Sequence, residues 1–363
     1  MDPQTLIEKA IQTYAAVQAH YYIPEESLYR ENSTPRPTDK PFSFLWPFSA
    51  VLSGVNALAR LPAVGERYRA DLLRTFDTLE QYYNGTRPAT LPAYEAYVRR
   101  FGGDTKFYDD NEWLGMEFVE AYRLLGDAYY LAKAQEMFAF AISGWTDEWA
   151  AGSGGIYWNE KEMATKNTCS NGPAAVLALM LYGETQRPDY LQWAQRLLRW
   201  LDPLKAPEGI YWDALNADGS IDTRIFTYNA GTPLHTNALL YSFTDDERYL
   251  NEARSLAEAA HRYFAIPHDG SDLPLYPATP WFNGVLLRGY IALYAADPNP
   301  NRQYIDAMRD NLLYAWDHAR DANGLFSNDW SGASGVDNPH KPILDQGAMI
   351  ELYALLAAFY ARL

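Results

Sequence analysis

The feature that most constrains the fold is a series of twelve helical segments that alternate between two kinds. One kind is charged on one face and repeats apolar residues on the other, as at Tyr190, Ala194 and Leu197 in 188–201, which indicates a half-buried helix. The other kind is apolar nearly all round, and 171–182 has no charged residue, which indicates burial on every side. The expected helices span 4–20, 45–59, 64–83, 111–125, 128–143, 171–182, 188–201, 232–243, 246–264, 281–296, 302–320 and 345–362.

The connections between these segments alternate as well. Each apolar segment is followed by a short link, and each charged segment is followed by a long connection such as 84–110 or 202–231. Long connections without secondary structure are uncommon in a compact domain and are usually functional. Because all six lead into apolar helices, we expect them to lie together at one end of the assembly.

A glycine recurs in these connections, at roughly one position per helix pair, which is typical of a repeat array. An open array needs polar caps on its terminal repeats, whereas the last helix, 345–362, is apolar nearly throughout. We therefore predict an all-α fold in which six helix pairs close into an (α/α)6 barrel, as a single domain over residues 1–363. The recurring glycines are Gly103, Gly155, Gly209, Gly270 and Gly324.

The balance of charge excludes several partners. The chain has 30 Lys and Arg against 46 Asp and Glu, a net charge of −16, whereas nucleic acids and anionic membranes reward clustered positive charge. The six histidines have no metal-ligand spacing, and no glycine-rich phosphate loop is present, so we expect no metal and no cofactor. The single cysteine, Cys169, can form no internal disulfide and is interpreted as an inert buried thiol.

The start of the chain and its hydropathy bear on localisation. Residues 1–20 mix Glu and Lys with apolar residues and lack the apolar core of a signal peptide. No run of about 18 apolar residues is present, so no membrane span is expected. These observations predict a cytoplasmic protein, or an extracellular one if a leader has been removed, and we expect a monomer.

Two neighbouring aspartates, Asp109 and Asp110, are the centre of the expected site. They follow two aromatic residues and lead directly into the apolar helix 111–125. Glycosidases commonly need one carboxyl group as acid and another as nucleophile or base. Like charges in contact cannot both ionise easily, so one of the pair keeps its proton while the helix N-terminus favours the ionised partner. The alternative is that Asp110 is an ordinary helix N-cap with Asp109 solvated beside it.

The long connections and the helix starts that follow them also carry aromatic and amide side chains. Aromatic rings pack against the C–H faces of sugars and fixed polar groups bind their hydroxyls, so these residues predict a carbohydrate cleft. Asn229 also fits a turn, and Arg288, alone on an apolar helix, fits an ion pair with a structural carboxylate as well as a substrate contact. The expected substrate-binding residues are Trp158, Asn159, Asn167, Tyr228, Asn229, Trp281, Arg288 and Trp330.

Three stretches resemble one enzyme family. Phe107–Trp113 resembles the Asp-Asp motif of glycoside hydrolase family 76, the endo-α-1,6-mannanases, and Gly154–Asn159 and Phe226–Gly231 are similar to later stretches of that family. The resemblance implies an (α/α)6 barrel and retaining hydrolysis of α-1,6-linked mannose backbones without a metal. It also implies that Asp109 is the nucleophile, that Asp110 is the acid/base, and that the partner is an α-mannan oligosaccharide or polysaccharide.

Two other functions stay open at the level of sequence. One is a sugar epimerase or isomerase of the N-acylglucosamine 2-epimerase type, which uses histidine bases at the mouth of the same kind of barrel, where His235 is near a helix start. The other is a non-catalytic glycan-binding protein that keeps the barrel. The first predicts interconversion of reducing sugars without bond cleavage, and the second predicts binding that survives loss of both aspartates.

Overall fold

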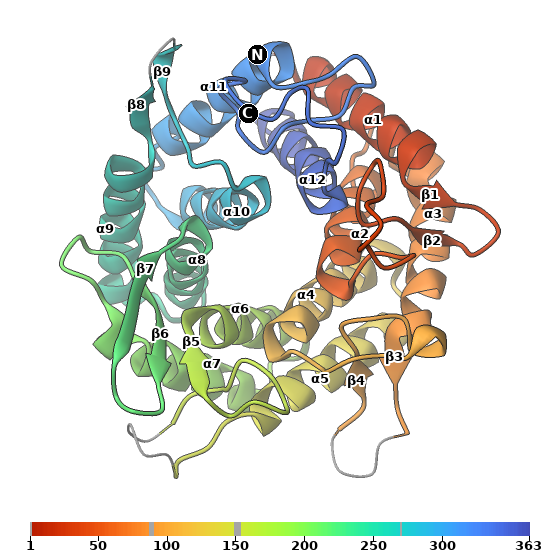
Figure 1. The fold of residues 1–363 in the computed structure, drawn as a ribbon. Coiled ribbons are helices and arrows are strands. Elements are labelled where there is room, and N and C mark those ends of the chain that lie inside the picture. Colours follow the sequence, from red (N-terminus) through yellow and green to blue (C-terminus); the bar gives the residue numbers. More distant parts are fainter. Residues whose placement is uncertain (1, 87–90, 149–153, 269–270) are drawn as a thin grey trace.

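The computed structural model describes residues 2–86, 91–148, 154–268 and 271–363, and it is predominantly helical (Figure 1). The recurring glycine Gly270 lies outside the described residues. The helices within the described ranges are α1 (Pro3–His20), α2 (Leu45–Ala59), α3 (Gly65–Leu79), α4 (Tyr108–Leu125), α5 (Ala128–Ser143), α6 (Thr168–Thr185), α7 (Pro188–Trp200), α8 (Thr227–Thr244), α9 (Glu247–Phe264), α10 (Pro280–Ala296), α11 (Gln303–His318) and α12 (Ile343–Tyr360).

Two concentric rings of helices make up the fold. Figure 1 shows α2, α4, α6, α8, α10 and α12 around the centre, with α1, α3, α5, α7, α9 and α11 outside them. Each inner helix packs against the next one, and α12 packs against α2, which closes the ring. The predicted (α/α)6 barrel is therefore confirmed, and the apolar and charged segments correspond to the inner and outer helices.

The helices α12 and α9 show how residue pattern sets position. By length and hydropathy α12 could cross a membrane, but 83% of its apolar window is buried inside the ring, so its composition follows from its place in the core. In α9 only one face is apolar, and Leu250, Ala253, Leu256 and Ala257 on that face are buried. This half-buried stripe packs α9 against α8 and leaves its charged face outward.

Glycines allow the inner helices to approach closely at two interfaces. A Cβ added at Gly347 of α12 would lie 2.6 Å from the carbonyl carbon of Ala50 in α2. A Cβ added at Gly231 of α8 would lie 2.8 Å from the Cα of Leu286 in α10. Because non-bonded carbon atoms pack at about 3.5–4.0 Å, a side chain at either position would push the helices apart.

Short hairpins occupy the long connections, where the sequence analysis expected no regular structure. They escaped prediction because strands of two to five residues are too short to show an alternating pattern. The largest is the antiparallel sheet β5-β6-β7, and the others pair β1 with β2, β3 with β4 and β8 with β9. The strands are β1 (Tyr22–Ile23), β2 (Leu28–Tyr29), β3 (Tyr83–Asn84), β4 (Ala93–Tyr94), β5 (Thr165–Asn167), β6 (Trp212–Asn216), β7 (Ile221–Ile225), β8 (Ile266–His268) and β9 (Ser271–Leu275).

A repeated hydrogen-bond arrangement links the connections to the inner helices. The fourth residue of three inner helices is an amide that accepts a hydrogen bond from one backbone N–H of the preceding connection and donates to the C=O of the same residue, at 2.8–3.2 Å. Each amide therefore makes the same two hydrogen bonds that a residue of a paired strand would make, and it holds the connection over the helix start. The pairs are Asn111 with Tyr94, Asn171 with Ile156, and Gln346 with Phe326.

Several inner helices begin earlier than hydrophobic periodicity predicted, although α2 begins at Leu45 as expected. Helix α4 begins at Tyr108 instead of 111, and α8 begins at Thr227 instead of 232. The first turns of these helices are rich in polar residues that face the connections, so they lack the apolar signal that marks the rest. As a consequence Asp109 and Asp110 lie in the first turn of α4, and the N-cap is Phe107. The alternative of Asp110 as an N-cap is wrong.

Candidate active site

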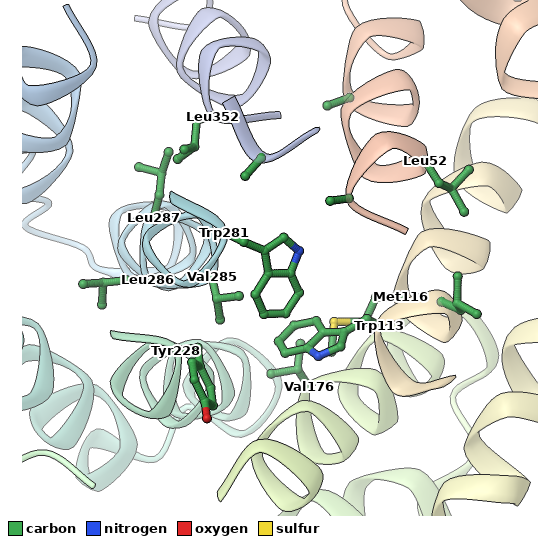
Figure 2. Close-up of a cluster of buried hydrophobic side chains, with 14 of the residues drawn as sticks. Leu52, Trp113, Met116, Val176, Tyr228, Trp281, Val285, Leu286, Leu287 and Leu352 are labelled. Atoms are coloured by element: carbon green, nitrogen blue, oxygen red, sulfur yellow. The ribbon is translucent and has the colours of Figure 1, made fainter. Parts of the chain in front are cut away.

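A cavity of about 710 Å³ opens over the first turns of the inner helices. Trp113 of α4 and Trp281 of α10 point toward one another inside the ring (Figure 2) and meet edge to face with ring centroids 5.0 Å apart. Trp281 also meets Trp46 of α2 edge to face at 5.4 Å. All three indoles line the cavity, so aromatic rings from α2, α4 and α10 together form one apolar side of it.

Asp109 lies in this cavity with donors around its carboxyl group. The backbone N–H of Asp110 donates to Oδ1 at 2.9 Å, and the indole N–H of Trp158 donates to Oδ2 at 3.2 Å. Burial raises the pKa of Asp109, and these bonds together with the Cys169 thiol limit the rise to about 6. The carboxyl group is therefore mostly ionised at neutral pH, and its place in the first helical turn favours the anion further.

Asp110 lines the same cavity but has different surroundings. No donor among the described residues forms a hydrogen bond with its carboxyl group. Burial, and then the charge of Asp109, raise the pKa of Asp110 well above the usual range for an aspartate. Two consecutive side chains thus favour opposite protonation states, because one is solvated by protein donors and the other is not.

A third acid, Glu112, lies behind the pair. It is fully buried, and its two carboxyl oxygens make no hydrogen bond of normal geometry in the described part of the chain. Burial, and then Asp109, raise the pKa of Glu112 well above its usual range, opposed by the nearby backbone N–H of Ala174. Burial therefore favours the neutral form of Glu112 over a third charge beside the pair. The sequence analysis missed it because its helical register, not its residue type, places it there.

The opposite wall carries a further carboxylate that sequence reasoning missed. Asp213 of β6 accepts hydrogen bonds at Oδ1 from the Tyr228 hydroxyl and the Asn229 amide, each at 3.1 Å. Its other oxygen meets the guanidinium of Arg224 at 3.3 Å. Burial raises the pKa of Asp213, although these donors oppose the rise. An isolated Asp on a short strand gives no sequence signal, and only the fold brings it to α8.

Aromatic side chains form the rest of the rim. Trp158 is 40% exposed and meets the ring of Phe107 edge to face at 4.9 Å. On the other side Phe226 stacks on Tyr228 at 5.5 Å, and Phe282 meets Tyr228 edge to face at 4.3 Å. All of these residues line the cavity. Their ring faces and edges offer the apolar surfaces on which sugar rings pack.

Most of the predicted site residues lie in the cavity, and two of them also stabilise its connections. Asn159 Oδ1 accepts from the backbone N–H groups of Lys161 and Glu162, at 2.9 and 2.7 Å. Asn167 Oδ1 accepts from the hydroxyl of Thr165 at 2.8 Å. Their side-chain oxygens are thus occupied by these bonds within the connections. The predicted residues that line the cavity are Asp109, Asp110, Trp158, Asn159, Asn167, Tyr228 and Trp281.

Three predicted substrate contacts require correction. Asn229 is fully buried outside the cavity wall and reaches Asp213 instead, so it positions a wall residue. Trp330 is 1% exposed and belongs to the hydrophobic core. The connection around it folds into a turn in which Asp329 accepts hydrogen bonds from the backbone N–H groups of Ser331 and Ser334.

Arg288 is the third correction. Its Nε donates to Glu351 at 2.6 Å and its Nη2 donates to Glu117 at 2.8 Å, deeper in the ring than the cavity walls. Burial opposes its charge, but the two carboxylates outweigh burial and raise the pKa of Arg288. Ser53 and Asn56 also donate to Glu117. The prediction of a substrate contact is wrong, and the structural ion pair is the correct alternative.

Histidine does not contribute to the described walls of the cavity. His235 lies in the middle of α8, where burial and then the charge of Arg288 lower its pKa to about 4. An epimerase that uses a histidine base at the mouth finds no such group there. In the part of the chain that the structure describes, no three His, Cys, Asp or Glu side chains converge as a metal site.

The geometry just described has a counterpart in known proteins. The profile named Glycosyl hydrolase family 76 matches residues 6–357, which includes all of the inner helices except the end of α12. The chain belongs to glycosyl hydrolase family 76. The predicted resemblance is therefore confirmed, and so is the expectation of a glycoside hydrolase.

Solved structures resemble this family 76 protein over its whole length. The mannosidase Bt3792 of Bacteroides thetaiotaomicron VPI-5482, also of family 76, is 27% identical, with a TM-score of 0.87 and coverage of 99% of both chains. A family 76 glycoside hydrolase from a bovine strain of that species is 28% identical, with a TM-score of 0.88 over 98% of this chain and 78% of that one.

A curated relative from yeast is similar over a shorter stretch. The mannan endo-1,6-alpha-mannosidase DCW1 of Candida albicans is 28% identical over 146 residues. The match covers 37% of this chain and 32% of the relative. The family 76 protein therefore matches about a third of the length of that relative.

Proposed function

We propose that this family 76 protein hydrolyses α-1,6-mannosidic linkages with retention of configuration, with Asp109 as nucleophile and Asp110 as acid/base. The observation that carries the proposal is the unequal environment of two consecutive carboxyl groups in one aromatic-walled cavity. Asp109 receives hydrogen bonds that favour its anion. Asp110 lies half-buried beside that anion, and burial and that charge raise its pKa well above the usual range, which favours its protonated form. A retaining glycosidase needs these two protonation states at the start of its cycle.

In the first step, Asp110 donates its proton to the glycosidic oxygen while the Asp109 carboxylate attacks the anomeric carbon from the opposite face. The bond to the leaving sugar breaks, and a covalent mannosyl ester forms on Asp109. In the second step, Asp110 takes a proton from water as the water oxygen attacks the same carbon. The ester bond breaks, and both carboxyl groups return to their starting states.

The walls of the cavity support these steps. The Trp158 indole N–H holds Asp109 Oδ2, which orients the other oxygen for attack. Burial favours the neutral form of Glu112 behind the pair, which leaves the charge of Asp109 as the main charged neighbour of Asp110. Asp213, fixed by Tyr228 and Asn229, offers a carboxylate that can accept hydrogen bonds from sugar hydroxyls.

The substrate class is supported by the relatives and by the composition of the cavity. The yeast relative is named a mannan endo-1,6-α-mannosidase, and the Bacteroides structure is named a mannosidase. The α-1,6-mannanase of Salegentibacter sp. HEL1_6 shares the fold at 24% identity with a TM-score of 0.79, and an inactive variant of it was solved in complex with α-1,6-mannotriose. Aromatic rings and acidic side chains suit a neutral, hydroxyl-rich polymer.

The test is incubation with linear α-1,6-mannan and with mannobiose to mannotetraose, followed by NMR during the first minutes. We expect shorter oligosaccharides whose new reducing ends appear first as the α-anomer, before mutarotation. New ends that appear first as the β-anomer would contradict the double displacement. Interconversion of monosaccharides without cleavage, or binding without any product, would contradict the hydrolase itself.

A further inference from the structure

A second, smaller cavity of about 190 Å³ lies beside the first. Its walls come from the segment that follows β2, which supplies Asn32 and Arg36, and from the connection between α11 and α12, which supplies Asn338 and His340. Pro342 lines both cavities. The two cavities are therefore neighbours on the same side of the ring, formed by the connections that lead into α2 and α12.

The partition between the cavities is a short antiparallel ladder. Asn32 pairs with Pro342, the Ser33 N–H donates to the Lys341 C=O at 3.0 Å, and the Ile343 N–H donates to the Glu31 C=O at 2.9 Å. Successive side chains of an extended segment point to opposite sides. Accordingly Glu31 lines the large cavity while Asn32 lines the small one. A ligand that occupies both cavities therefore needs to pass only over this ladder.

Asp345 lines the small cavity from the first turn of α12. It is 8% exposed, and no hydrogen bond or ion pair reaches its carboxyl group from any residue that the structure describes. The next residue, Gln346, has both ends of its amide bonded to Phe326. A buried carboxyl group without a partner carries a cost, and nothing in the packing of α12 requires an acid here. The cavity in front of it is where a partner would bind.

The charges around the cavity indicate which ligand fits. Lys341 beside it is fully occupied, since its Nζ donates to Asp321 and to the C=O groups of Val336 and Asn338. Its positive charge and that of Arg36 disfavour a metal cation, whereas Asp345 disfavours an anion. A neutral ligand with hydroxyl donors for Asp345 and acceptors for amides satisfies the site. The volume suits a single sugar ring.

We propose that this small cavity is an outlying subsite that binds one hexopyranosyl unit of the polysaccharide cleaved in the large cavity. The proposal rests on the proposed function, because the unit it binds belongs to the same substrate chain. Asp345 accepts hydroxyl hydrogen bonds from that unit. Asn32, whose Nδ2 donates to Asp39, contributes its Oδ1. Asn338, whose Oδ1 accepts from the His340 N–H, contributes its Nδ2. Substrates long enough to cross the ladder at Pro342 gain this contact, whereas short substrates that occupy the large cavity alone do not.

The test compares Asp345→Asn with the wild type on linear α-1,6-manno-oligosaccharides of increasing length. The matched control is Asp337→Asn, an exposed carboxylate in the same connection that does not line the cavity. We expect kcat/KM of Asp345→Asn to match the wild type on short substrates and to fall about tenfold above a threshold length, because a hydrogen bond between a sugar hydroxyl and the Asp345 carboxyl group is lost. Asp337→Asn should match the wild type at every length. Equal values at all lengths, or the same loss at all lengths, would overturn the subsite.

A second measurement does not depend on cleavage. Methyl α-mannoside is titrated into the wild type and Asp345→Asn, and the side-chain amide resonances of Asn32 and Asn338 are followed by NMR. We expect these resonances to shift in the wild type and to shift far less in Asp345→Asn. Unmoved resonances in the wild type at saturating sugar would overturn the subsite. Absence of cleavage of every substrate, with the resonances still moving, would refute the proposed hydrolysis and leave the sugar-binding cavity standing.

Discussion

Two levels of the ring interior hold buried or half-buried carboxyl groups in opposite ways. Deep in the ring, Glu117 and Glu351 share the guanidinium of Arg288. At the cavity level, Asp109, Asp110 and Glu112 lie within four residues of one another, and no described Lys or Arg forms an ion pair with any of them. The deep carboxylates share one cation, whereas the upper acids lie close together without one.

The ion-paired carboxylates have a structural role, whereas the unpaired acids are typical of a functional site. Charges taken out of water are tolerated when each finds a partner, and removal of one partner is then strongly destabilising. Unpaired acids with raised pKa values reduce stability at neutral pH, and such groups concentrate at functional sites. In the sequence, charged residues that have an ion-pair partner and acids that have none look the same, because both are polar residues on apolar helices. Only their partners distinguish Arg288, which pairs with two carboxylates across the ring, from Asp110, which lines the cavity.

The largest expected effect is on activity at the cavity level. Asp109→Asn and Asp110→Asn should each lower kcat/KM by about 10²–10⁴-fold, because each removes a positioned reacting group. Neither should lower the free energy of unfolding at pH 7. An amide removes a carboxyl group whose ionised form burial disfavours. Activity assays paired with denaturant unfolding check this, and a variant that loses activity by losing its fold would contradict the comparison.

The deep level should respond in the opposite sense. Arg288→Met leaves Glu117 and Glu351 buried without their cation, and we expect a loss of about 3–5 kcal/mol in the free energy of unfolding. The control Arg302→Met removes an exposed ion pair with Asp306 and should change stability by about 0–1 kcal/mol. If the two variants unfold at the same denaturant concentration, the deep ion pair does not hold the ring.

The pH dependence of stability offers a smaller test. Burial raises the pKa of Asp345 to about 7, above its value in the unfolded chain, so the folded protein binds the extra proton. Its stabilising contribution is full below about pH 4 and is lost as pH rises through about 7, by up to about 4 kcal/mol. Asp345→Asn should flatten the decline between pH 4 and pH 8, measured by denaturant unfolding. The exposed-site control is Asp337→Asn. If the free energy of unfolding of Asp345→Asn declines as steeply with pH as that of the control, Asp345 does not cause the decline.

The smallest expected effect tests the donors around Asp109. Trp158→Phe removes the indole N–H at 3.2 Å and keeps an aromatic ring, so the pKa of Asp109 should rise above about 6. Because the nucleophile must be ionised, the acid limb of kcat/KM should move to higher pH, with a loss of about tenfold or less at pH 6. Trp193→Phe, on the outer helix α7, serves as the control. An unmoved acid limb in Trp158→Phe would show that this bond does not tune Asp109.

The fold was largely predictable because its signal is global. An inner helix is buried on all sides, so apolar residues are expected on every face. The segment 171–182 shows this pattern without reference to the segments around it. The ends of those helices were not predictable, since the polar first turn at Thr227 is held by contacts with its connection. The hairpin of β6 and β7, with Asp213 on it, depends on pairing between distant segments that no local pattern records.

The site was predictable where residue type alone decides its chemistry. Consecutive acids beside aromatics, as at Asp109 and Asp110, are unusual enough to be noticed in a sequence. Trp330 and Trp158 look alike in sequence, yet one lies under its connection and the other at the rim. Glu112 and Asp213 were missed for the converse reason, because an acid on a helix or strand is common and acquires meaning only from the residues that the fold places around it.

The central claim is that Asp109 and Asp110 divide the work of nucleophile and proton donor, and azide rescue tests it most directly. Asp109→Ala leaves space for azide at the nucleophile's position, and Asp110→Ala, with an activated aryl α-mannoside, lets azide replace the attacking water. We predict a β-mannosyl azide from Asp109→Ala and an α-mannosyl azide from Asp110→Ala, identified by NMR. The reverse pair of anomers would contradict the assignment.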